Sequence, residues 1–179
     1  MGKNATEIFR IDPWRIVEEG FDPSRNRVCE SVFSIANEAV GARGYCEEST
    51  GVDSLPGTYC NGIYDYAAKE NHTAYKGIVR RTHFMVTAPD WLWLRFSLDG
   101  EAFDMGTAAV EGHTRALDMR TGLLTREFVW VTQSGKRLAV RLERLFCMDA
   151  AERACQRLTV TPLGFDGQLD VSMAVDFGA

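Results

Sequence analysis

Long apolar runs and paired cysteines are both missing from this sequence. A helix that crosses a bilayer needs about 20 mostly apolar residues, and every apolar run here is far shorter. The five cysteines form no Cys-x-x-Cys pair and stand in no Cys/His spacing typical of a metal site. An odd, dispersed set of cysteines indicates reduced thiols rather than a disulfide framework. The sequence therefore predicts a cytoplasmic protein with no membrane span and no metal site.

Positive charge is also scarce. The 20 lysines and arginines are outnumbered by 25 aspartates and glutamates, which gives a net charge of −5. A nucleic-acid-binding surface depends on clustered lysine and arginine, so this balance argues against nucleic acid as a partner. The remaining composition, 45% hydrophobic and 25% charged, is that of an ordinary globular protein. A length of 179 residues fits one domain with a substantial core.

Alternation of apolar and polar residues dominates the second half of the chain. In "WLWLRFSL", residues 91–98, every second residue is leucine or phenylalanine, which is the period of a half-buried β-strand. Asp99-Gly100 follows, a pair typical of two-residue hairpin turns. Ser134-Gly135 separates the apolar runs of residues 126–133 and 136–146 in the same way, and a further turn is predicted around Asp166-Gly167, between residues 156–162 and 168–175. The pattern predicts antiparallel hairpins.

Two local irregularities accompany these strands. The apolar alternation slips between Leu142 and Leu145, which predicts a β-bulge. Residues 148–155, "MDAAERAC", are the only segment with a briefly helical composition, and we expect them to form a short connection.

Many long strands without a sustained helical pattern predict an all-β chain, built as a sandwich of large antiparallel sheets. The last strand pattern runs directly into Asp176-Phe177-Gly178 and stops at residue 179. We therefore expect residues 1–179 to be one β-sandwich domain of a longer protein, cut within its sheet pattern.

The stretch "ESVFSIANEAVGARGYCEE", residues 30–48, is apolar yet rich in ionisable groups. Within an all-β chain, its centre predicts two short strands that meet at Asn37-Glu38. Buried charges need partners. We therefore expect Arg43 to pair with some of the carboxylates of Glu30, Glu47 and Glu48, at the domain edge or across an interdomain contact.

Several blocks of sequence resemble the N-terminal domain of glycoside hydrolase family 65, the family of the maltose, trehalose, kojibiose and nigerose phosphorylases. One block is Glu30-Ser31-x-Phe33-Ser34-x-x-Asn37, continued by Gly41-x-Arg43-Gly44 and Glu47-Glu48. The others are EEGFD (18–22), PGTYCNGIYD (56–65), APDWLWL (88–94), RALDMRTGLLTRE (115–127), and TPLG with DGQLDVSMAVD (161–164 and 166–176). The family has Asn-Gly where this chain has Asn37-Glu38. Glutamate lacks glycine's freedom at positive φ, so we expect a longer turn or another turn type here.

The resemblance implies a galactose-mutarotase-like supersandwich that precedes a helical linker and a catalytic (α/α)6 barrel. In the family the general acid, a glutamate, and the phosphate-holding groups lie in that barrel, and no residue of this chain matches them. The chain would then be a non-catalytic scaffold domain of an inverting phosphorylase of α-glucosidic disaccharides, or of a related glycoside hydrolase. The implied partners are the barrel, an α-glucoside substrate and a second subunit in a homodimer. Inorganic phosphate is the implied co-substrate, and no cofactor is implied.

A free-standing carbohydrate-binding module is an alternative. Trp91 and Trp93 share a strand face with Arg95, and an aromatic face beside a guanidinium suits a sugar in shape and polarity. Because tryptophans also fill interfaces between layers, we favour packing between the sheets, or against the barrel, over a sugar platform.

A mutarotase-like sugar epimerase is the second alternative, since such enzymes use histidines with a carboxylate. The three histidines are His72, His83 and His113, and we place them in a loop, a strand and a turn. Their spacing matches no catalytic motif, so we expect structural or surface roles. Glu47 and Glu48 would face opposite ways on a strand, so we expect them to be solvated or interdomain rather than catalytic.

Overall fold

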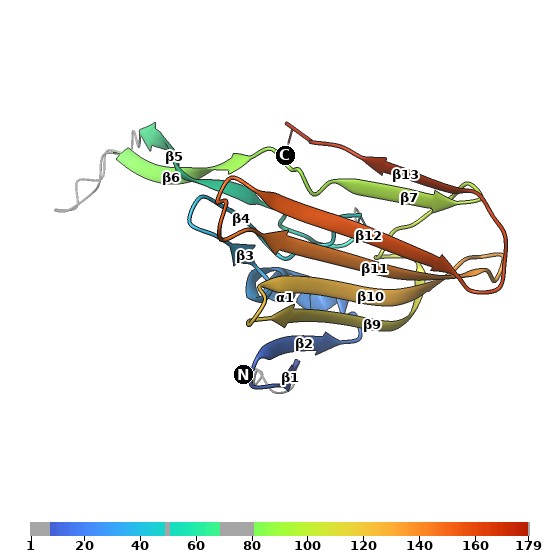
Figure 1. Cartoon of the computed structure of the whole chain (residues 1–179). Coiled ribbons are helices and arrows are strands. Elements are labelled where there is room, and N and C mark those ends of the chain that lie inside the picture. The colour runs from blue at the N-terminus through green and yellow to red at the C-terminus, as the bar shows by residue number, and fades with distance from the viewer. Residues whose placement is uncertain (1–7, 49–50, 69–80, 179) are drawn as a thin grey trace.

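Antiparallel strands build almost the whole molecule, so the predicted all-β class is confirmed (Figure 1). The computed structural model describes residues 8–48, 51–68 and 81–178. The strands are β1 (Phe9–Ile11), β2 (Arg15–Glu19), β3 (Ile35–Ala36), β4 (Val40–Ala42), β5 (Thr58–Ala68), β6 (Arg81–Ala88), β7 (Leu94–Leu98), β8 (Glu101–Ala102), β9 (Ala109–Asp118), β10 (Leu123–Val131), β11 (Arg137–Phe146), β12 (Ala154–Pro162) and β13 (Leu169–Met173). They form a six-stranded sheet in the order β1-β2-β9-β10-β11-β12, a three-stranded sheet β13-β7-β8, and a four-stranded sheet β3-β4-β5-β6.

The hairpin turns predicted at Asp99-Gly100 and Ser134-Gly135 are confirmed, whereas the turn predicted around Asp166-Gly167 does not close a hairpin. Asp99 and Gly100 join β7 to β8 with φ values of 51° and 83°, so both central residues adopt the positive φ of a type I′ turn. β10 and β11 pair antiparallel across the loop that contains Ser134-Gly135. After β12 the chain does not form another hairpin, because β13 pairs with β7 in the three-stranded sheet. The connection through Asp166-Gly167 therefore crosses from one sheet to the other.

The first core cluster lies between the six-stranded and three-stranded sheets. The predicted inward face of β7 is confirmed, since Leu94, Phe96 and Leu98 are all buried. Phe96 packs edge-on against Trp130 of β10, with ring centroids 5.9 Å apart. Burying an aromatic ring removes a large apolar area from water, at about 25 cal/mol per Å². The contact between the two sheets therefore provides much of the stability of the sandwich. The buried members of the cluster are Cys46, Leu94, Phe96, Leu98, Phe103, Met105, Phe128, Trp130, Leu138, Val140 and Leu142.

The second core cluster lies around a short helix that the sequence analysis did not predict. This helix, α1 (Asn26–Val32), follows a 3-10 turn over Pro23–Arg25 whose N-cap is Asp22. Asp22 accepts a hydrogen bond from the backbone N–H of Ser24 at 3.0 Å, and proline at the first position suits a helix start. The short connection expected at residues 148–155 is confirmed: bends and a turn, without a helix, link β11 to β12 there. The buried members of this cluster are Cys29, Phe33, Ile35, Ala42, Tyr45, Leu92, Leu124 and Phe146.

The β-bulge predicted between Leu142 and Leu145 is wrong. β11 keeps an unbroken register with both neighbouring strands. Its inward row continues from Leu142 through Arg144 to Phe146, all of which are buried. The apolar pattern slips because an arginine occupies an inward position. A register shift does occur in this sheet, but between β9 and β10.

The two short strands predicted in residues 33–43 are present as β3 and β4. They are joined by three residues, Asn37, Glu38 and Ala39, and Glu38 does not adopt positive φ. The turn is therefore longer than an Asn-Gly hairpin, as the substitution of glutamate for glycine predicts. No helix in the described ranges is long and apolar enough to cross a bilayer.

Candidate functional site

Charged side chains gather inside the sandwich rather than on a surface cleft. Arg115 on β9, Arg126 on β10 and Arg144 on β11 all occupy inward positions and are buried. Inward positions recur every second residue along a strand, and Arg126 and Arg144 each stand two residues before a buried phenylalanine. With Glu18, Glu47 and Glu48 they form a group that we call the ionic cluster.

Glu47 and Glu48 provide the anions at the centre of this cluster. Nη2 of Arg126 donates to Glu47 Oε2 at 3.0 Å and also to Glu48 Oε2. Nη2 of Arg144 donates to the other oxygen of Glu47. Both glutamates are buried, so the expectation of a solvated or interdomain position is wrong. Because they lie in a turn and not on a strand, adjacent side chains can face the same arginine.

A close backbone approach brings this turn into the core. A Cβ atom on Gly44 would lie 2.6 Å from Cβ of Phe33, which leaves no room for any other residue. The N–H of Gly44 donates to the carbonyl of Glu30 at 2.8 Å, and its own carbonyl accepts from Nη1 of Arg115 at 2.7 Å. Arg115 in turn lies 3.0 Å from the carboxylate of Glu18. The segment after Gly44 is thus fixed to both α1 and the six-stranded sheet.

The charges inside the cluster compensate one another. Burial opposes the ionisation of Glu47, but the charges of Arg144 and Arg126 outweigh it, so the pKa of Glu47 lies below its ordinary value. Removing one partner from a buried pair leaves an uncompensated charge. A carboxyl that is held ionised cannot donate a proton as a general acid near neutral pH. The geometry therefore suits a structural role.

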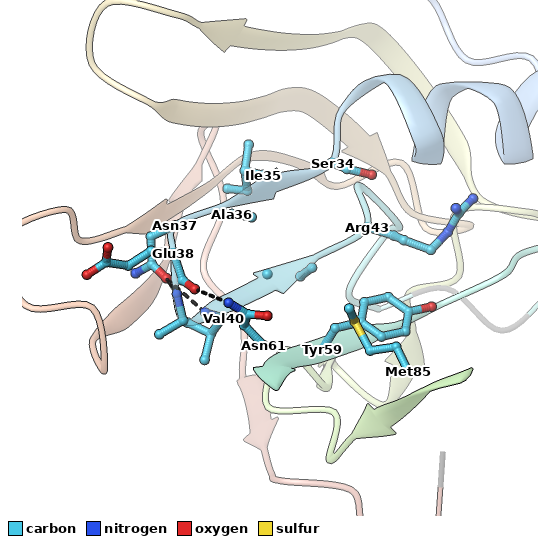
Figure 2. Close-up of a pocket in the computed structure, with 13 residues that line it drawn as sticks. Ser34, Ile35, Ala36, Asn37, Glu38, Val40, Arg43, Tyr59, Asn61 and Met85 are labelled. Carbon is cyan, nitrogen blue, oxygen red and sulfur yellow. Dashed lines mark hydrogen bonds between the residues drawn. The ribbon is translucent and has the colours of Figure 1, made fainter. Parts of the chain in front are cut away.

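A hollow of about 480 Å³ lies beside the β3–β4 turn (Figure 2). Asn37 organises this turn: its Oδ1 accepts from the N–H groups of Ala39 and Val40 at 2.9 and 2.8 Å. Its Nδ2 donates to the carbonyls of Cys147 and Ala151 at 2.8 and 2.9 Å. A single side chain thereby ties the turn to the loop between β11 and β12.

Arg43 also lines the hollow, and its guanidinium is engaged within the chain. Its Nε donates to the carbonyl of Leu55 at 2.7 Å and its Nη2 to Oγ of Ser31 at 2.9 Å. Nη2 lies 3.8 Å from a carboxylate oxygen of Glu30, which is completely buried. Of the three carboxylates considered for Arg43, Glu30 is the one that it approaches, whereas Glu47 binds other arginines. The guanidinium of Arg43 is therefore committed to contacts within the chain.

Trp91, Trp93 and Arg95 do not form a single platform. The ring of Trp91 packs edge-on against Phe146 at 5.7 Å, so it belongs to the border of the second core cluster. The guanidinium of Arg95 lies over Trp93 at 4.8 Å and covers one face of the ring, while its Nη1 donates to the carbonyl of Leu94 at 2.9 Å. A sugar site that uses these three residues stays an untested prediction.

The histidines lie apart from one another where they are described. His113 lies on β9, not in a turn, and is buried; its Nδ1 donates to the carbonyl of Gly20 at 2.9 Å. Burial, together with the charge of Arg126, lowers the pKa of His113 to about 3. His83 is exposed on β6, and His72 lies outside the described residues. Within the described ranges, no three His, Cys, Asp or Glu residues are placed to hold a metal ion.

The sequence analysis did not identify the arginines of the ionic cluster as site residues. Arg115, Arg126 and Arg144 each interrupt an apolar alternation at an inward position. The position of each arginine in the strand alternation could have identified it, because an arginine that points outward would stand one residue earlier or later.

Comparison with known proteins gives consistent matches over nearly the whole chain. The profile described as "Glycosyl hydrolase family 65, N-terminal domain" matches residues 16–179. The chain is 28% identical to the alpha,alpha-trehalose phosphorylase of Thermoanaerobacter brockii, over 97% of this chain and 23% of the relative. It is 30% identical to the maltose phosphorylase of Bacillus subtilis, over 81% of this chain and 19% of the relative.

A solved structure described as a kojibiose phosphorylase from the human microbiome matches with a TM-score of 0.85 and 35% identity. The match covers 92% of this chain and 22% of that one. The chain thus spans less than a quarter of the length of each of these relatives.

Proposed function

Because the chain belongs to glycosyl hydrolase family 65, whose N-terminal domain it matches over residues 16–179, we propose that it is the non-catalytic scaffold of a longer enzyme that phosphorolyses an α-glucosidic disaccharide. Named relatives that it matches are phosphorylases of trehalose, maltose and kojibiose. Each is at least four times as long as the matched region, which supports a role as one domain among several.

The observation that carries this proposal is the pairing of the buried carboxylates. Inverting phosphorolysis requires phosphate to attack the anomeric carbon while a carboxylic acid protonates the leaving oxygen. Such an acid needs a raised pKa. In the described ranges the buried glutamates are Glu18, Glu30, Glu47, Glu48 and Glu143, and each has an arginine within 4 Å. Each of these carboxylates thus already has a cationic partner within the chain, and the pKa values of Glu47 and Glu143 lie below their ordinary value, which supports a structural role for the domain.

The partners follow from the same proposal. The substrate and the co-substrate, inorganic phosphate, would bind in the remaining part of the polypeptide, the catalytic barrel of the family. This domain would pack on that barrel and contribute to a homodimer of the full-length enzyme. Its five free cysteines suit a reducing compartment, which supports a cytoplasmic location.

Activity measurements on two proteins test the proposal. The 179-residue chain and the full-length polypeptide that contains it are each incubated with inorganic phosphate and trehalose, maltose or kojibiose. We expect release of glucose 1-phosphate by the full-length polypeptide and none by the 179-residue chain. Release by the short chain would contradict the non-catalytic role, and inactivity of the long polypeptide on every α-glucosidic disaccharide would contradict the phosphorylase assignment.

Calorimetric titration of the 179-residue chain with a sugar distinguishes a carbohydrate-binding module from a scaffold domain. Heat of binding that disappears in a Trp93→Ala variant would favour that module over a scaffold.

A further inference from the structure

The β5–β6 pair forms a long ribbon that projects from the sandwich. β5 pairs with β4 only through Thr58–Cys60, opposite Val40–Ala42. Beyond that point residues 64–68 pair with β6 alone among the described strands. Figure 1 shows the ribbon extending past the ends of its neighbours. A two-stranded ribbon is at best marginally stable in water unless something packs against it.

An irregularity in β5 places its tyrosines on one face. Tyr59 pairs with Thr87 and Tyr64 pairs with Met85. A step of five residues along β5 is therefore matched by a step of only two residues along β6. Gly62, with φ of 81°, lies within this irregularity. Since Thr87 and Met85 are two residues apart on a regular strand, they share a face. Tyr59 and Tyr64 therefore share it too.

The same face continues outward along the ribbon. Tyr66 pairs with His83, two residues beyond Tyr64 and Met85. Tyr64 is 55% exposed, Tyr66 53% and Met85 40%. We call Tyr59, Tyr64, Tyr66, His83 and Met85 the tyrosine face. None of these five residues is a lysine, arginine, aspartate or glutamate, and tyrosine and methionine are enriched at protein interfaces where charge is depleted.

The tyrosine face is continuous with the hollow beside the β3–β4 turn. Tyr59 and Met85 line that hollow, and Figure 2 shows their side chains together at its edge. Two of the polar side chains beside them are already bonded within the chain: Arg43 to Leu55 and Ser31, and Asn61 Nδ2 to the carbonyl of Glu38 at 3.0 Å. A sugar site needs convergent polar groups, so an apolar protein surface fits this region better.

We infer that the tyrosine face and the adjoining hollow are the docking surface for the catalytic part of the same polypeptide. This inference rests on the proposed function, in which the domain is one part of a longer enzyme. The relatives support it, because 77 to 79% of the trehalose and kojibiose phosphorylases lies outside the matched region. Asp176, after β13, also exchanges backbone hydrogen bonds with Asp90, just after β6. A polypeptide that follows β13 therefore passes the base of the ribbon, and such tethering favours docking over encounter with a free partner.

The test compares the same substitutions in two proteins. Tyr64→Ala with Tyr66→Ala is introduced into the full-length polypeptide and into the 179-residue chain. Asp65→Ala, between them on the opposite face, is the matched control. We expect the double substitution to lower the midpoint of thermal unfolding of the full-length polypeptide by about 4 °C or more, because buried aromatic anchors dominate interfaces. In the 179-residue chain the same substitution should change the midpoint by less than about 1 °C, as expected for exposed side chains.

Equal shifts in both proteins, or no shift in the full-length polypeptide, would overturn the inference. So would sedimentation showing that the 179-residue chain is a dimer that the double substitution dissociates, since the occupant would then be a second copy. Phosphorolysis by the unsubstituted full-length polypeptide is measured in parallel. If that activity is absent while the differential shift persists, the proposed function fails and the docking surface stands.

Discussion

Arg126 holds two carboxylates in the buried ionic cluster. Its Nη2 contacts both Glu47 and Glu48, and all three side chains are buried. Breaking a buried ion pair by removing one partner is strongly destabilising, because the remaining charge has lost both water and its counter-ion. The stability of the sandwich should therefore depend on this arginine more than on any exposed one.

Substitution of Arg126 by methionine tests this dependence. We expect the free energy of unfolding of the 179-residue chain, from urea denaturation, to fall by about 3–5 kcal/mol. Arg137→Met is the matched control, because the Arg137–Glu111 pair is half exposed and should contribute less than about 1 kcal/mol. Adding Glu48→Gln to Arg126→Met should restore part of the loss, because Arg126 is the arginine that Glu48 contacts, whereas Glu47 keeps Arg144. Equal small effects of Arg126→Met and Arg137→Met would contradict the role given to the cluster.

The ionic cluster could be predicted only in part from the sequence. The need for partners around residues 30–48 followed from the density of charges there. The identity of the partners did not, because alternation analysis treats arginine as an outward residue. Arg144 was consequently taken as a break in the strand, although it stands in phase with Phe146. Pairing over about 97 residues of sequence, between Glu47 and Arg144, is set by the fold and not by local pattern.

At the scale of elements, the β3–β4 turn depends on one side chain. Asn37 accepts two backbone hydrogen bonds within the turn and donates two to the loop after β11. Removing a side chain in such a position leaves buried or half-buried backbone groups without partners, and each unsatisfied group is costly. The two sheets that this side chain connects should then separate more readily at this corner.

Asn37→Ala should lower the free energy of unfolding by about 2–3 kcal/mol. Asn37→Asp keeps the two acceptor contacts but places a carboxylate against the carbonyls of Cys147 and Ala151, so it should be at least as harmful. Asn61→Ala, which removes one exposed hydrogen bond to Glu38, is the control and should cost less than about 1 kcal/mol. The measurement is urea denaturation of the 179-residue chain, followed by tryptophan fluorescence. A milder effect of Asn37→Asp than of Asn37→Ala would show that the two donated bonds matter little.

Elements with strong local signals were predicted, and those that depend on distant contacts were not. The turn at Asp99-Gly100 followed from residue types that tolerate positive φ. Helix α1 was missed because seven residues are too few for a helical period to stand out, and the one local signal nearby, Asp22 followed by Pro23, caps the preceding 3-10 turn and not α1 itself. The transfer of β13 to the sheet of β7 could not be read from Asp166-Gly167, because a turn pair does not specify which strand will be the partner.

At the scale of the whole molecule, one short segment joins the two core clusters. Tyr45 belongs to the second cluster and its neighbour Cys46 to the first. Arg144 donates to the carbonyl of Tyr45 at 3.0 Å, and Arg126 binds the glutamates that follow. Because the two clusters share this segment and its arginines, opening one of them exposes charges that belong to both. We therefore expect the described molecule to unfold as one cooperative unit.

The cysteines can report on this cooperativity, because each cluster contains one of them. Burial and a hydrogen bond to Glu18 raise the pKa of Cys29 to about 12, and burial also raises the pKa of Cys46. The thiolate is the reactive form, so both should resist iodoacetamide at pH 8, whereas the exposed Cys155 should react at once. With increasing urea, labelling measured by mass spectrometry should appear at Cys29 and Cys46 with the same midpoint. Labelling of Cys29 at clearly lower urea than Cys46 would mean that the helix-containing cluster opens on its own, and that the shared segment does not couple the two.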